Sequence, residues 1–213
     1  MTRIGLTQRV EVIESYGERR DCLDQAWTTL LSAYDPIPLP NCVADADAYL
    51  DRLDLDGVIL TSGNDLASLE DPDDPAPERD RFETAVLEYA IAEQIPILGV
   101  CRGLEFLTVH FGGTLSPVSG HVASDHQVRF ASDVTAIDLP ETVTVNSYHD
   151  YGIEPTGVPA DLDVVGTADD GTVECVRHRE LPIWGIMWHP ERASPSADLD
   201  RQLLGHLFPT ERR

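Results

Sequence analysis

Hydrophobic residues in the first half of the chain follow two alternating patterns, short apolar runs and runs with helical spacing. The run at 96–100 is apolar throughout, as in a parallel-sheet strand that is buried on both faces. Between 21 and 34, apolar residues recur every three or four positions, which predicts a helix with one buried stripe. The loop predicted at 62–77 is rich in Pro, Gly and Asp. The other predicted strands are 3–8, 35–40, which is a strand or an extended edge, and 57–61. The other predicted helices are 45–53, 77–93 and one that includes 104–107.

The second half has valine- and threonine-rich segments with little helix between them. We interpret these segments as antiparallel strands, some of which extend the main sheet, and we expect a closing helix at 198–208. Alternating strands and helices in the first half indicate a doubly wound α/β sheet. We therefore predict a mostly parallel, flavodoxin-like sheet with flanking helices and extra antiparallel strands, in one domain over 1–213. The predicted antiparallel strands are 126–130, 134–137, 142–147, 163–167, 172–177 and 182–188.

The charge of the chain is unusual, because 38 acidic residues face 15 basic ones and all 15 are arginine. A net charge of -23 argues against nucleic acid or an anionic membrane as a partner, since both bind positive surfaces. Many carboxylates without lysine are typical of proteins that work in concentrated salt. In 1 M salt the Debye length is roughly 3 Å, so repulsion between the carboxylates is screened. We predict a halophilic protein; an ordinary acidic protein is the alternative.

The four cysteines are widely scattered and form no CxxC pair of the kind that binds zinc or does redox chemistry. The first residues contain no apolar run long enough for a signal peptide. The chain also has no stretch near the roughly 18 consecutive apolar residues that a membrane span needs. We therefore expect a soluble protein in a reducing cytoplasm.

One cysteine stands where a catalytic nucleophile would be expected. Gly99-Val-Cys101-Arg-Gly103 follows the 96–100 strand directly and leads into a helical pattern, as in a nucleophile elbow with cysteine in place of serine. The positive end of the helix dipole would stabilise a thiolate there, and ligands of open α/β sheets bind at this end of the strands. A buried structural cysteine is the alternative.

A candidate base lies near the other end of the chain, where an apolar segment runs into His189-Pro-Glu191. Residues two apart on an extended chain point the same way, so His189 and Glu191 can face one pocket. A nucleophilic cysteine needs a histidine to take its proton, and that histidine needs a carboxylate to fix its tautomer. The alternative is a histidine that merely ends a strand.

The cysteine elbow, the Thr61-Ser-Gly-Asn-Asp65 loop and the His189-Pro-Glu191 segment, in this order, resemble the class I glutamine amidotransferase superfamily. Within it, the elbow with Arg102 and the Val145-Asn-Ser-Tyr-His149 segment are similar to the γ-glutamyl hydrolase branch, which includes γ-glutamyl-γ-aminobutyrate hydrolases. Residues 4–9 and 20–27 resemble, more narrowly, bacterial γ-glutamyl-CDP-amidate hydrolases. The resemblance covers nearly the whole chain.

The resemblance implies a catalytic triad of Cys101, His189 and Glu191. It also implies an oxyanion hole formed by the backbone N–H groups of Gly63 and Arg102, each of which would contribute about 3 kcal/mol to transition-state stabilisation. The residues implied to surround the γ-glutamyl group are Asn64, Arg102, Glu105, Ser147, Tyr148 and His149. An ordinary turn at Asn64 and an ordinary strand end at 147–149 are the alternatives.

Two positions depart from the family pattern. Glu105 stands where the family usually has glutamine. Its carboxylate would either bind the α-ammonium group of the substrate or lower activity by disfavouring the nearby thiolate. The loop has Ser62-Gly63 where many relatives have two glycines, which keeps the oxyanion-hole donor and narrows the backbone freedom.

The reaction implied by the resemblance is hydrolysis of a small γ-glutamyl amide through a thioester at Cys101, and it needs no metal and no organic cofactor. Two other functions stay open: a glutaminase subunit that passes ammonia to a synthase, and a non-catalytic binding protein on the same fold. A homodimer also stays open.

A nucleotide amidate substrate carries phosphate, so a chain of this charge would need arginines at its pocket. The candidates are Arg9, Arg19 and Arg20, near the first strand and helix, and Arg102 at the elbow. We expect the first strand near the centre of the sheet, which would put Arg9 beside the pocket. The alternative is that these arginines only offset surface carboxylates.

Overall fold

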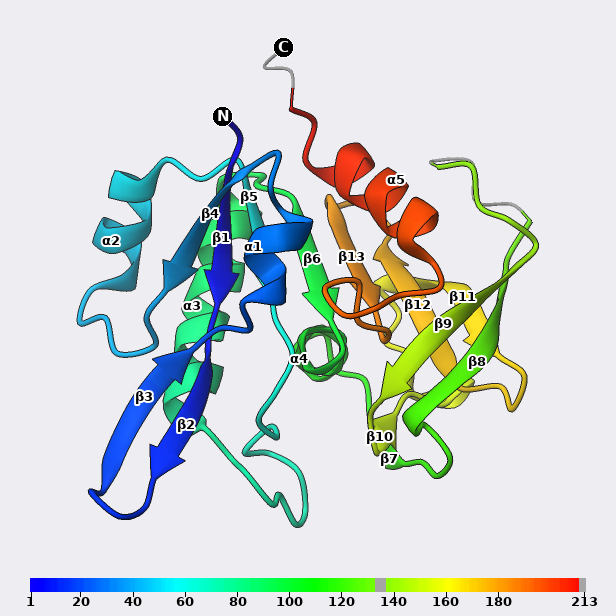
Figure 1. The fold of residues 1–213 in the computed structure, drawn as a ribbon, viewed down its shortest axis with the longest axis horizontal. Coiled ribbons are helices and arrows are strands. Elements are labelled where there is room, and N and C mark those ends of the chain that lie inside the picture. Colours follow the sequence, from blue (N-terminus) through cyan, green and yellow to red (C-terminus); the bar gives the residue numbers. More distant parts are fainter. Residues whose placement is uncertain (133–136, 211–213) are drawn as a thin grey trace.

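The computed structural model describes residues 1–132 and 137–210, and a nine-stranded sheet lies at the centre of this part of the chain (Figure 1). Five neighbouring strands are parallel, and the remaining four continue the sheet in antiparallel order. In sheet order the strands are β4 (Asp35–Leu39), β1 (Arg3–Thr7), β5 (Gly57–Leu60), β6 (Ile97–Val100), β13 (Ile183–Ile186), β12 (Val173–His178), β11 (Leu162–Ala168), β8 (Val122–Phe130) and β9 (Thr142–Tyr148). The predicted fold class is confirmed.

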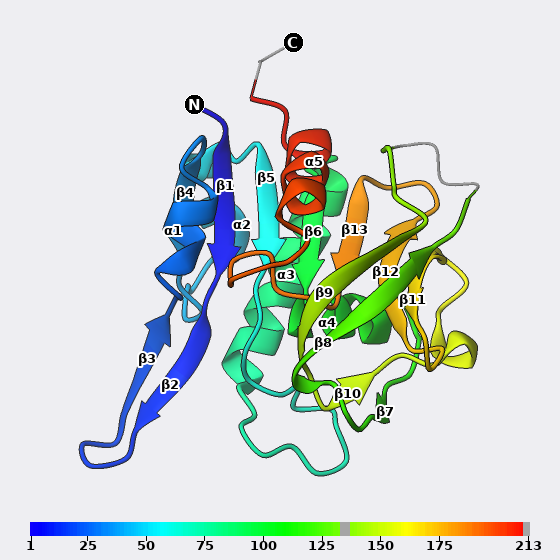
Figure 2. The same ribbon diagram turned by 45° about the vertical axis from the view of Figure 1, so that its right-hand side comes forward.

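Helices cover both faces of the sheet. Trp27 of α1 and Leu203 of α5 belong to one buried apolar cluster, and Leu50 of α2 and Phe82 of α3 belong to another. Figures 1 and 2 show α5 on one side of the sheet and α3 on the other. The helices are α1 (Ala26–Leu30), α2 (Ala46–Leu53), α3 (Pro77–Ala92), α4 (Arg102–His110) and α5 (Ala197–Leu207), with a 3-10 turn η1 (Pro155–Gly157) and a two-stranded pair β7 (Ser116–Pro117) and β10 (Tyr151–Gly152).

Of the helix predicted at 21–34, only Ala26–Leu30 is helical, so the prediction is wrong at both ends. Residues 9–22 instead form a hairpin of β2 (Arg9–Ile13) and β3 (Glu18–Cys22), which extends away from the sheet in Figure 2. Gly17, with φ of 65°, is in the turn that joins the two strands. Cys22 pairs with Arg9 in this hairpin, so cross-strand hydrogen bonds override the helical spacing that Cys22 shares with later residues.

The sheet corrects two further predictions. The strand predicted at 182–188 is β13, which pairs parallel with β6 and antiparallel with β12, so it joins the two halves of the sheet. All four of its residues are buried. β1 lies between β4 and β5, one strand from the edge rather than near the centre. The strand predicted at 134–137 falls mainly on residues 133–136, which lie outside the described part of the chain.

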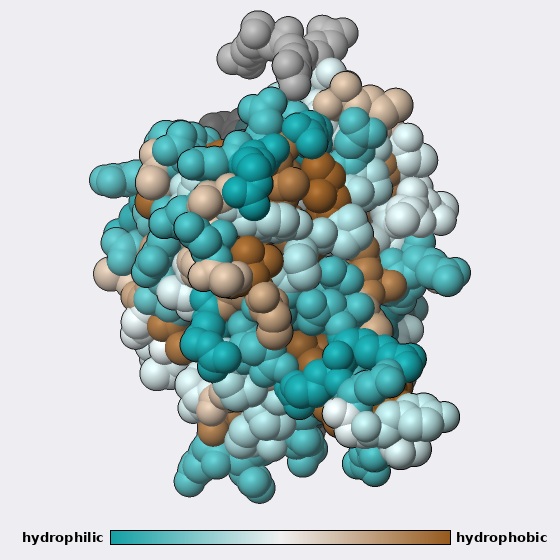
Figure 3. All heavy atoms as spheres, turned by 90° about the vertical axis from the view of Figure 1, so that its left-hand side faces the viewer, coloured by the Kyte–Doolittle hydropathy of each residue, from teal (hydrophilic) through white to brown (hydrophobic). Residues whose placement is uncertain are grey.

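The surface is strongly polar. Figure 3 shows the face that carries α2 and the hairpin, where hydrophilic residues dominate and apolar residues are scattered. Among the described helices, none is long and apolar enough to cross a membrane.

Candidate active site

Cys101 follows β6 directly and has a backbone conformation that side chains rarely adopt, with φ of 51° and ψ of -107°. Its N–H donates to the carbonyl oxygen of Ile186 at 2.8 Å, and its own carbonyl accepts from Leu104 at 2.8 Å in the first turn of α4. Bonds on both sides hold the residue in this strained conformation, which costs on the order of 1–3 kcal/mol. The predicted strand–turn–helix elbow is therefore present.

Glycines allow the strands and α4 to approach closely at the elbow. A Cβ at Gly103 would lie 2.2 Å from the carbonyl oxygen of Leu60 on β5, and a Cβ at Gly99 would lie 2.7 Å from the backbone of Gly103. Real Cβ atoms do not come this close to backbone atoms, so alanine at either position would push α4 away from the sheet.

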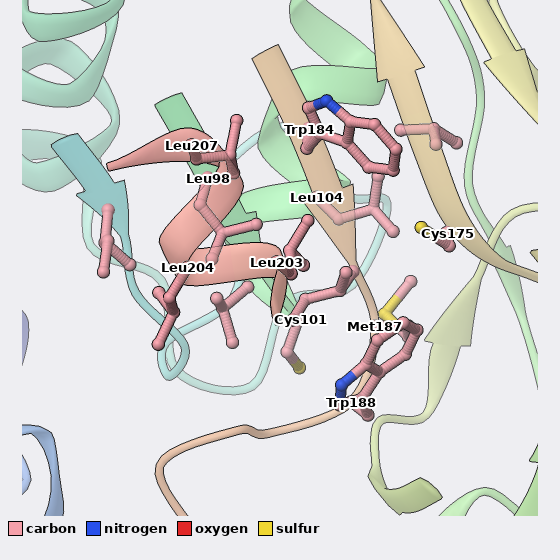
Figure 4. Close-up of a cluster of buried hydrophobic side chains, with 14 of the residues drawn as sticks. Leu98, Cys101, Leu104, Cys175, Trp184, Met187, Trp188, Leu203, Leu204 and Leu207 are labelled. Atoms are coloured by element: carbon pink, nitrogen blue, oxygen red, sulfur yellow. The ribbon is translucent and has the colours of Figure 1, made fainter. Parts of the chain in front are cut away.

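The thiol of Cys101 lies at the edge of the core. Figure 4 shows it beside Met187 and Trp188, and 7% of the residue is exposed. Burial raises the pKa of the thiol well above its ordinary value, the charge of Glu105 raises it further, and the backbone N–H of Arg102 lowers it. The four cysteines are free, and Cys175 lies inside the core.

His189 and Glu191 form a buried pair. The Nδ1 atom of His189 lies 2.8 Å from Oε1 of Glu191, and its Nε2 atom is buried with no hydrogen-bond partner in the described part of the chain. A proton shared with Glu191 stays on Nδ1, so Nε2 of the neutral ring carries the lone pair that a general base needs. β6 and β13 are neighbouring parallel strands, with Val100 opposite Ile186, so Cys101 and His189 lie at the same end of the sheet.

Asn146 fixes the backbone of His189 and was not among the predicted site residues. Its Oδ1 accepts from the N–H of His189 at 2.8 Å, and its Nδ2 donates to the carbonyl oxygen of His189 at 2.9 Å. The only sequence signal was its place inside the 145–149 motif.

The loop after β5 turns through Gly63, with φ of 84°, and Asn64, with φ of 59°. On one side, the guanidinium of Arg79 donates to the carbonyl oxygens of Thr61 at 2.5 Å, Ser62 at 3.1 Å and Gly63. The carbonyl of Ser62 and the N–H of Gly63 belong to one trans peptide unit, so they point in opposite directions. The N–H of Gly63 therefore points away from Arg79, as an oxyanion-hole donor would.

A buried ion-pair network joins this loop to the elbow. Glu83, which is fully buried on α3, accepts from Nε of Arg79 at 2.8 Å and also accepts from Arg102. Arg102 pairs with Asp80 as well. The side chain of Arg102 is thus bonded to α3, and its backbone N–H is the part of the residue at the elbow. Arg79 and Glu83 had no sequence signal, because charges near a helix start usually face solvent.

Asn64 and Arg9 lie beside Gly63. The side-chain amide of Asn64 bonds the backbone of Val10 on β2, with Oδ1 2.7 Å from its N and Nδ2 2.9 Å from its O. A Cβ at Gly63 would lie 3.2 Å from Cδ of Arg9, so the stem of Arg9 covers the turn. The guanidinium of Arg9 pairs with Glu11.

The remaining arginines predicted to bind phosphate also have carboxylate partners. Arg19 pairs with Glu78 of α3, and Arg20 pairs with Glu18 within the hairpin.

The 147–149 segment presents its residues on two sides. Tyr148 is 42% exposed, and its ring meets that of His189 edge-on at 5.5 Å between centroids. Arg192, which was also not among the predicted site residues, stacks over Tyr148 with its guanidinium carbon 4.1 Å from the ring centroid. Ser147 and His149 are buried on the other side, where Ser147 Oγ donates to the carbonyl oxygen of His121 at 2.5 Å.

Glu105 lies one turn into α4 and is 7% exposed. Burial raises the pKa of its carboxyl to about 7, against the opposing effects of the charges on His149 and Arg102. Near neutral pH this residue therefore exists in both protonation states beside Cys101. Among the described residues, His121, His126 and Glu174 could hold a metal ion, and they contact Ser147 and His149.

Known proteins resemble this chain over most of its length. The Peptidase C26 family matches residues 14–191. A γ-glutamyl-CDP-amidate hydrolase from Campylobacter jejuni is 36% identical over 194 residues, which cover 89% of this chain and 90% of that protein. Anthranilate synthase component 2 from Azospirillum brasilense is 31% identical over 160 residues, covering 74% and 75% of the two chains.

The solved structure of a glutamine amidotransferase from Thermotoga maritima matches with a TM-score of 0.63 at 17% identity, covering 89% of this chain and 76% of that one. At this identity the match supports the fold alone. The family match and the sequence relatives together show more: the chain belongs to the Peptidase C26 family, which is class I glutamine amidotransferase-like.

Proposed function

We propose that this chain is a cysteine hydrolase of γ-glutamyl amide bonds, with Cys101, His189 and Glu191 as its catalytic triad. The observation that carries the proposal is the unpartnered Nε2 of His189, which is buried, oriented by Glu191 and placed on the strand next to the elbow of Cys101. A buried polar atom without a partner is costly, and the thiol proton of Cys101 would supply one.

The reaction would have two stages. His189 takes the thiol proton, and the Cys101 sulfur attacks the γ-carbonyl carbon while the N–H groups of Gly63 and Arg102 stabilise the oxyanion. The C–N bond then breaks as His189 returns the proton to the leaving amine, which leaves a thioester. Water gives a proton to His189 and attacks the thioester, the C–S bond breaks, and glutamate and free thiol are released.

The amine side of the substrate is proposed as a nucleotide amidate. The Campylobacter relative supports this choice, and so does a cationic rim formed by Arg9 beside Gly63 and Arg192 over Tyr148. Both guanidinium groups are partly exposed and could pair with phosphate.

A second candidate is a glutaminase subunit that delivers ammonia to a separate synthase. It is favoured by the similarity to anthranilate synthase component 2, which covers about three quarters of this chain. The two candidates share the thioester chemistry and differ in substrate and partner.

One assay separates these functions. The purified protein, alone in molar KCl, is incubated with γ-glutamyl-CDP-amidate, γ-glutamyl-γ-aminobutyrate or glutamine, and released glutamate is measured. We expect release from a γ-glutamyl amide larger than glutamine, its loss in Cys101→Ala, and its retention in the matched variant Cys42→Ala at an exposed cysteine. Activity on glutamine only with a partner would support the glutaminase subunit. No release from any substrate would favour a binding protein.

A further inference from the structure

Three imidazoles surround one buried carboxylate, and one of the three belongs to His149 of the 147–149 segment. Glu174, on β12, has no exposed surface. Its Oε2 lies 3.3 Å from Nε2 of His126, and its Oε1 lies 3.5 Å from Nε2 of His149 and 3.7 Å from Nδ1 of His121. The ligand atoms of His121, His126 and Glu174 all lie within 4.8 Å of one another.

The tautomers of two of these rings are fixed from outside the cluster. Nδ1 of His149 lies 2.7 Å from the carbonyl oxygen of Tyr151, so it carries a proton. Nε2 of His121 lies 2.8 Å from a carboxylate oxygen of Asp170, so it carries one as well. In the neutral rings the other two nitrogens, Nδ1 of His121 and Nε2 of His149, then face each other 3.2 Å apart as lone pairs.

The carboxylate of Glu174, at the centre of the cluster, also lacks hydrogen bonds from the described residues. Neither oxygen of Glu174 has a hydrogen-bond partner among the described residues, and neither has Nε2 of His126, although all three atoms are buried. A buried charge without a partner costs several kcal/mol even after relaxation. With its rings neutral, the cluster therefore presents several lone pairs to one point.

We propose that His121, His126 and Glu174 bind a divalent transition-metal ion such as Zn²⁺, with Nε2 of His149 beside the ion as a fourth ligand. Zinc bonds of 2.0–2.1 Å in a tetrahedron would place ligand atoms about 3.3 Å apart. Four of the separations here are 3.2–3.7 Å, and the ligand atoms of His121, His126 and Glu174 all lie within 4.8 Å, which is close to that spacing before any ion is bound. Imidazole nitrogens with one carboxylate suit zinc, cobalt or nickel better than magnesium or calcium.

The outer contacts also fit a metal site. Histidine ligands usually donate their second N–H to a carboxylate or a backbone carbonyl, which sets the ring orientation. Asp170 does this for His121, and Tyr151 does it for His149.

The ion would take no part in the proposed reaction. It would stabilise the 147–149 segment and the end of β13, which lie beside the candidate active site. The backbone of His121 accepts from Ser147 Oγ and from the N–H of His149, and the carbonyl of Glu174 accepts from the N–H of Met187 at 2.8 Å, two residues before His189. The inference thus goes beyond the proposed hydrolase function and does not depend on it.

Metal binding is tested on the full chain, stripped with chelator and kept in molar KCl. Zn²⁺ binding is measured by calorimetry, bound metal by elemental analysis, and Co²⁺ geometry by its visible absorption. We expect one Zn²⁺ per chain and a tetrahedral Co²⁺ spectrum. His126→Ala should bind at least about 100-fold more weakly, and Asp170→Asn about 10–100-fold more weakly, as outer-contact losses do.

The matched control is His206→Ala, since His206 is exposed on α5, away from the cluster. It should bind Zn²⁺ like the unaltered chain, so that weaker binding by His126→Ala is specific to the cluster and is caused neither by surface carboxylates nor by the loss of any one histidine. Circular dichroism checks that each variant is folded. Equal Zn²⁺ binding by the unaltered chain and His126→Ala, or no stoichiometric binding by the unaltered chain, would mean that protons alone hold the cluster and would overturn the proposal.

Discussion

Arg79 donates a hydrogen bond from its guanidinium to the carbonyl oxygen of Gly63, so helix α3 holds the loop that follows β5. The same guanidinium is paired with Glu83, which also binds Arg102 at the elbow. Both proposed oxyanion-hole donors, on two different segments, are thus tied to one carboxylate. Such fixed donors need no reorganisation when charge develops on the substrate.

Glu83→Gln should be strongly destabilising. It would leave two buried guanidinium groups without their shared carboxylate, and breaking a buried pair costs about 3–5 kcal/mol. The free energy of unfolding is measured by urea denaturation in molar KCl. Glu78→Gln on the same helix removes a surface partner of Arg19 and should cost at most about 1 kcal/mol. Equal losses in the two variants would contradict the importance of the buried network.

Glu191→Gln should slow glutamate release by about 10⁴-fold while the protein stays folded, because an amide no longer holds the imidazole of His189 in the required tautomer. Steady-state kinetics and circular dichroism check the two parts of this expectation. Glu180→Gln, at an exposed position, is the control. An unchanged rate would mean that another carboxylate, or none, serves His189.

Glu105→Gln should lower the pKa of the Cys101 thiol, because the charge of Glu105 is the largest effect after burial that raises it. The measurement is the rate of alkylation of Cys101 by iodoacetamide as a function of pH, followed by mass spectrometry. The profile of the variant should lie at lower pH than that of the unaltered chain. Superimposed profiles would show that Glu105 stays protonated throughout the reactive range.

The same residue should make stability depend on pH. Burial raises the folded-state pKa of Glu105 from 4.5 to about 7, so the folded chain binds a proton that the unfolded chain releases. The extra bound proton adds about 3 kcal/mol to the free energy of unfolding. This stabilisation is fully present below pH 4.5 and is lost as pH rises through 7. Urea melts across this range should show a smaller fall in stability for Glu105→Gln than for the unaltered chain. Parallel curves would contradict the raised pKa.

The net charge of -23 should make the fold depend on salt. At about 0.1 M salt the Debye length grows to roughly 10 Å, so carboxylates repel one another over a longer range. We expect a lower melting temperature at 0.1 M KCl than at molar KCl. The same melting temperature at both concentrations would remove the proposal that the protein is halophilic.

Local patterns made much of the fold predictable. The apolar run that became β6, the glycines around Cys101 and the His189-Pro-Glu191 segment each carry their information within a few residues. The β2–β3 hairpin was missed because its register depends on cross-strand pairing, as between Arg9 and Cys22, and the spacing of Cys22 also fits a helix.

The charged interior was not predictable in the same way. Arg79 and Arg102 look like surface residues in the sequence, and only the packing of α3 against the β5 loop and α4 buries them. His121 and His126 lie just before and within β8, His149 follows β9 and Glu174 is on β12, so no single spacing signature joins the cluster. Composition and periodicity contain no information about contacts between distant segments, so this part of the site could not be predicted.

The shared carboxylate of Glu83 has a consequence for local opening. Any movement of α3 that withdraws Arg79 from the 61–64 loop also withdraws Glu83 from Arg102, so the loop and the first turn of α4 should open together. Cooperative units of this kind have one opening free energy for all their amides. In hydrogen–deuterium exchange, the amides of Gly63 and Glu105 should therefore exchange with the same temperature dependence, although 42 positions separate them in the sequence.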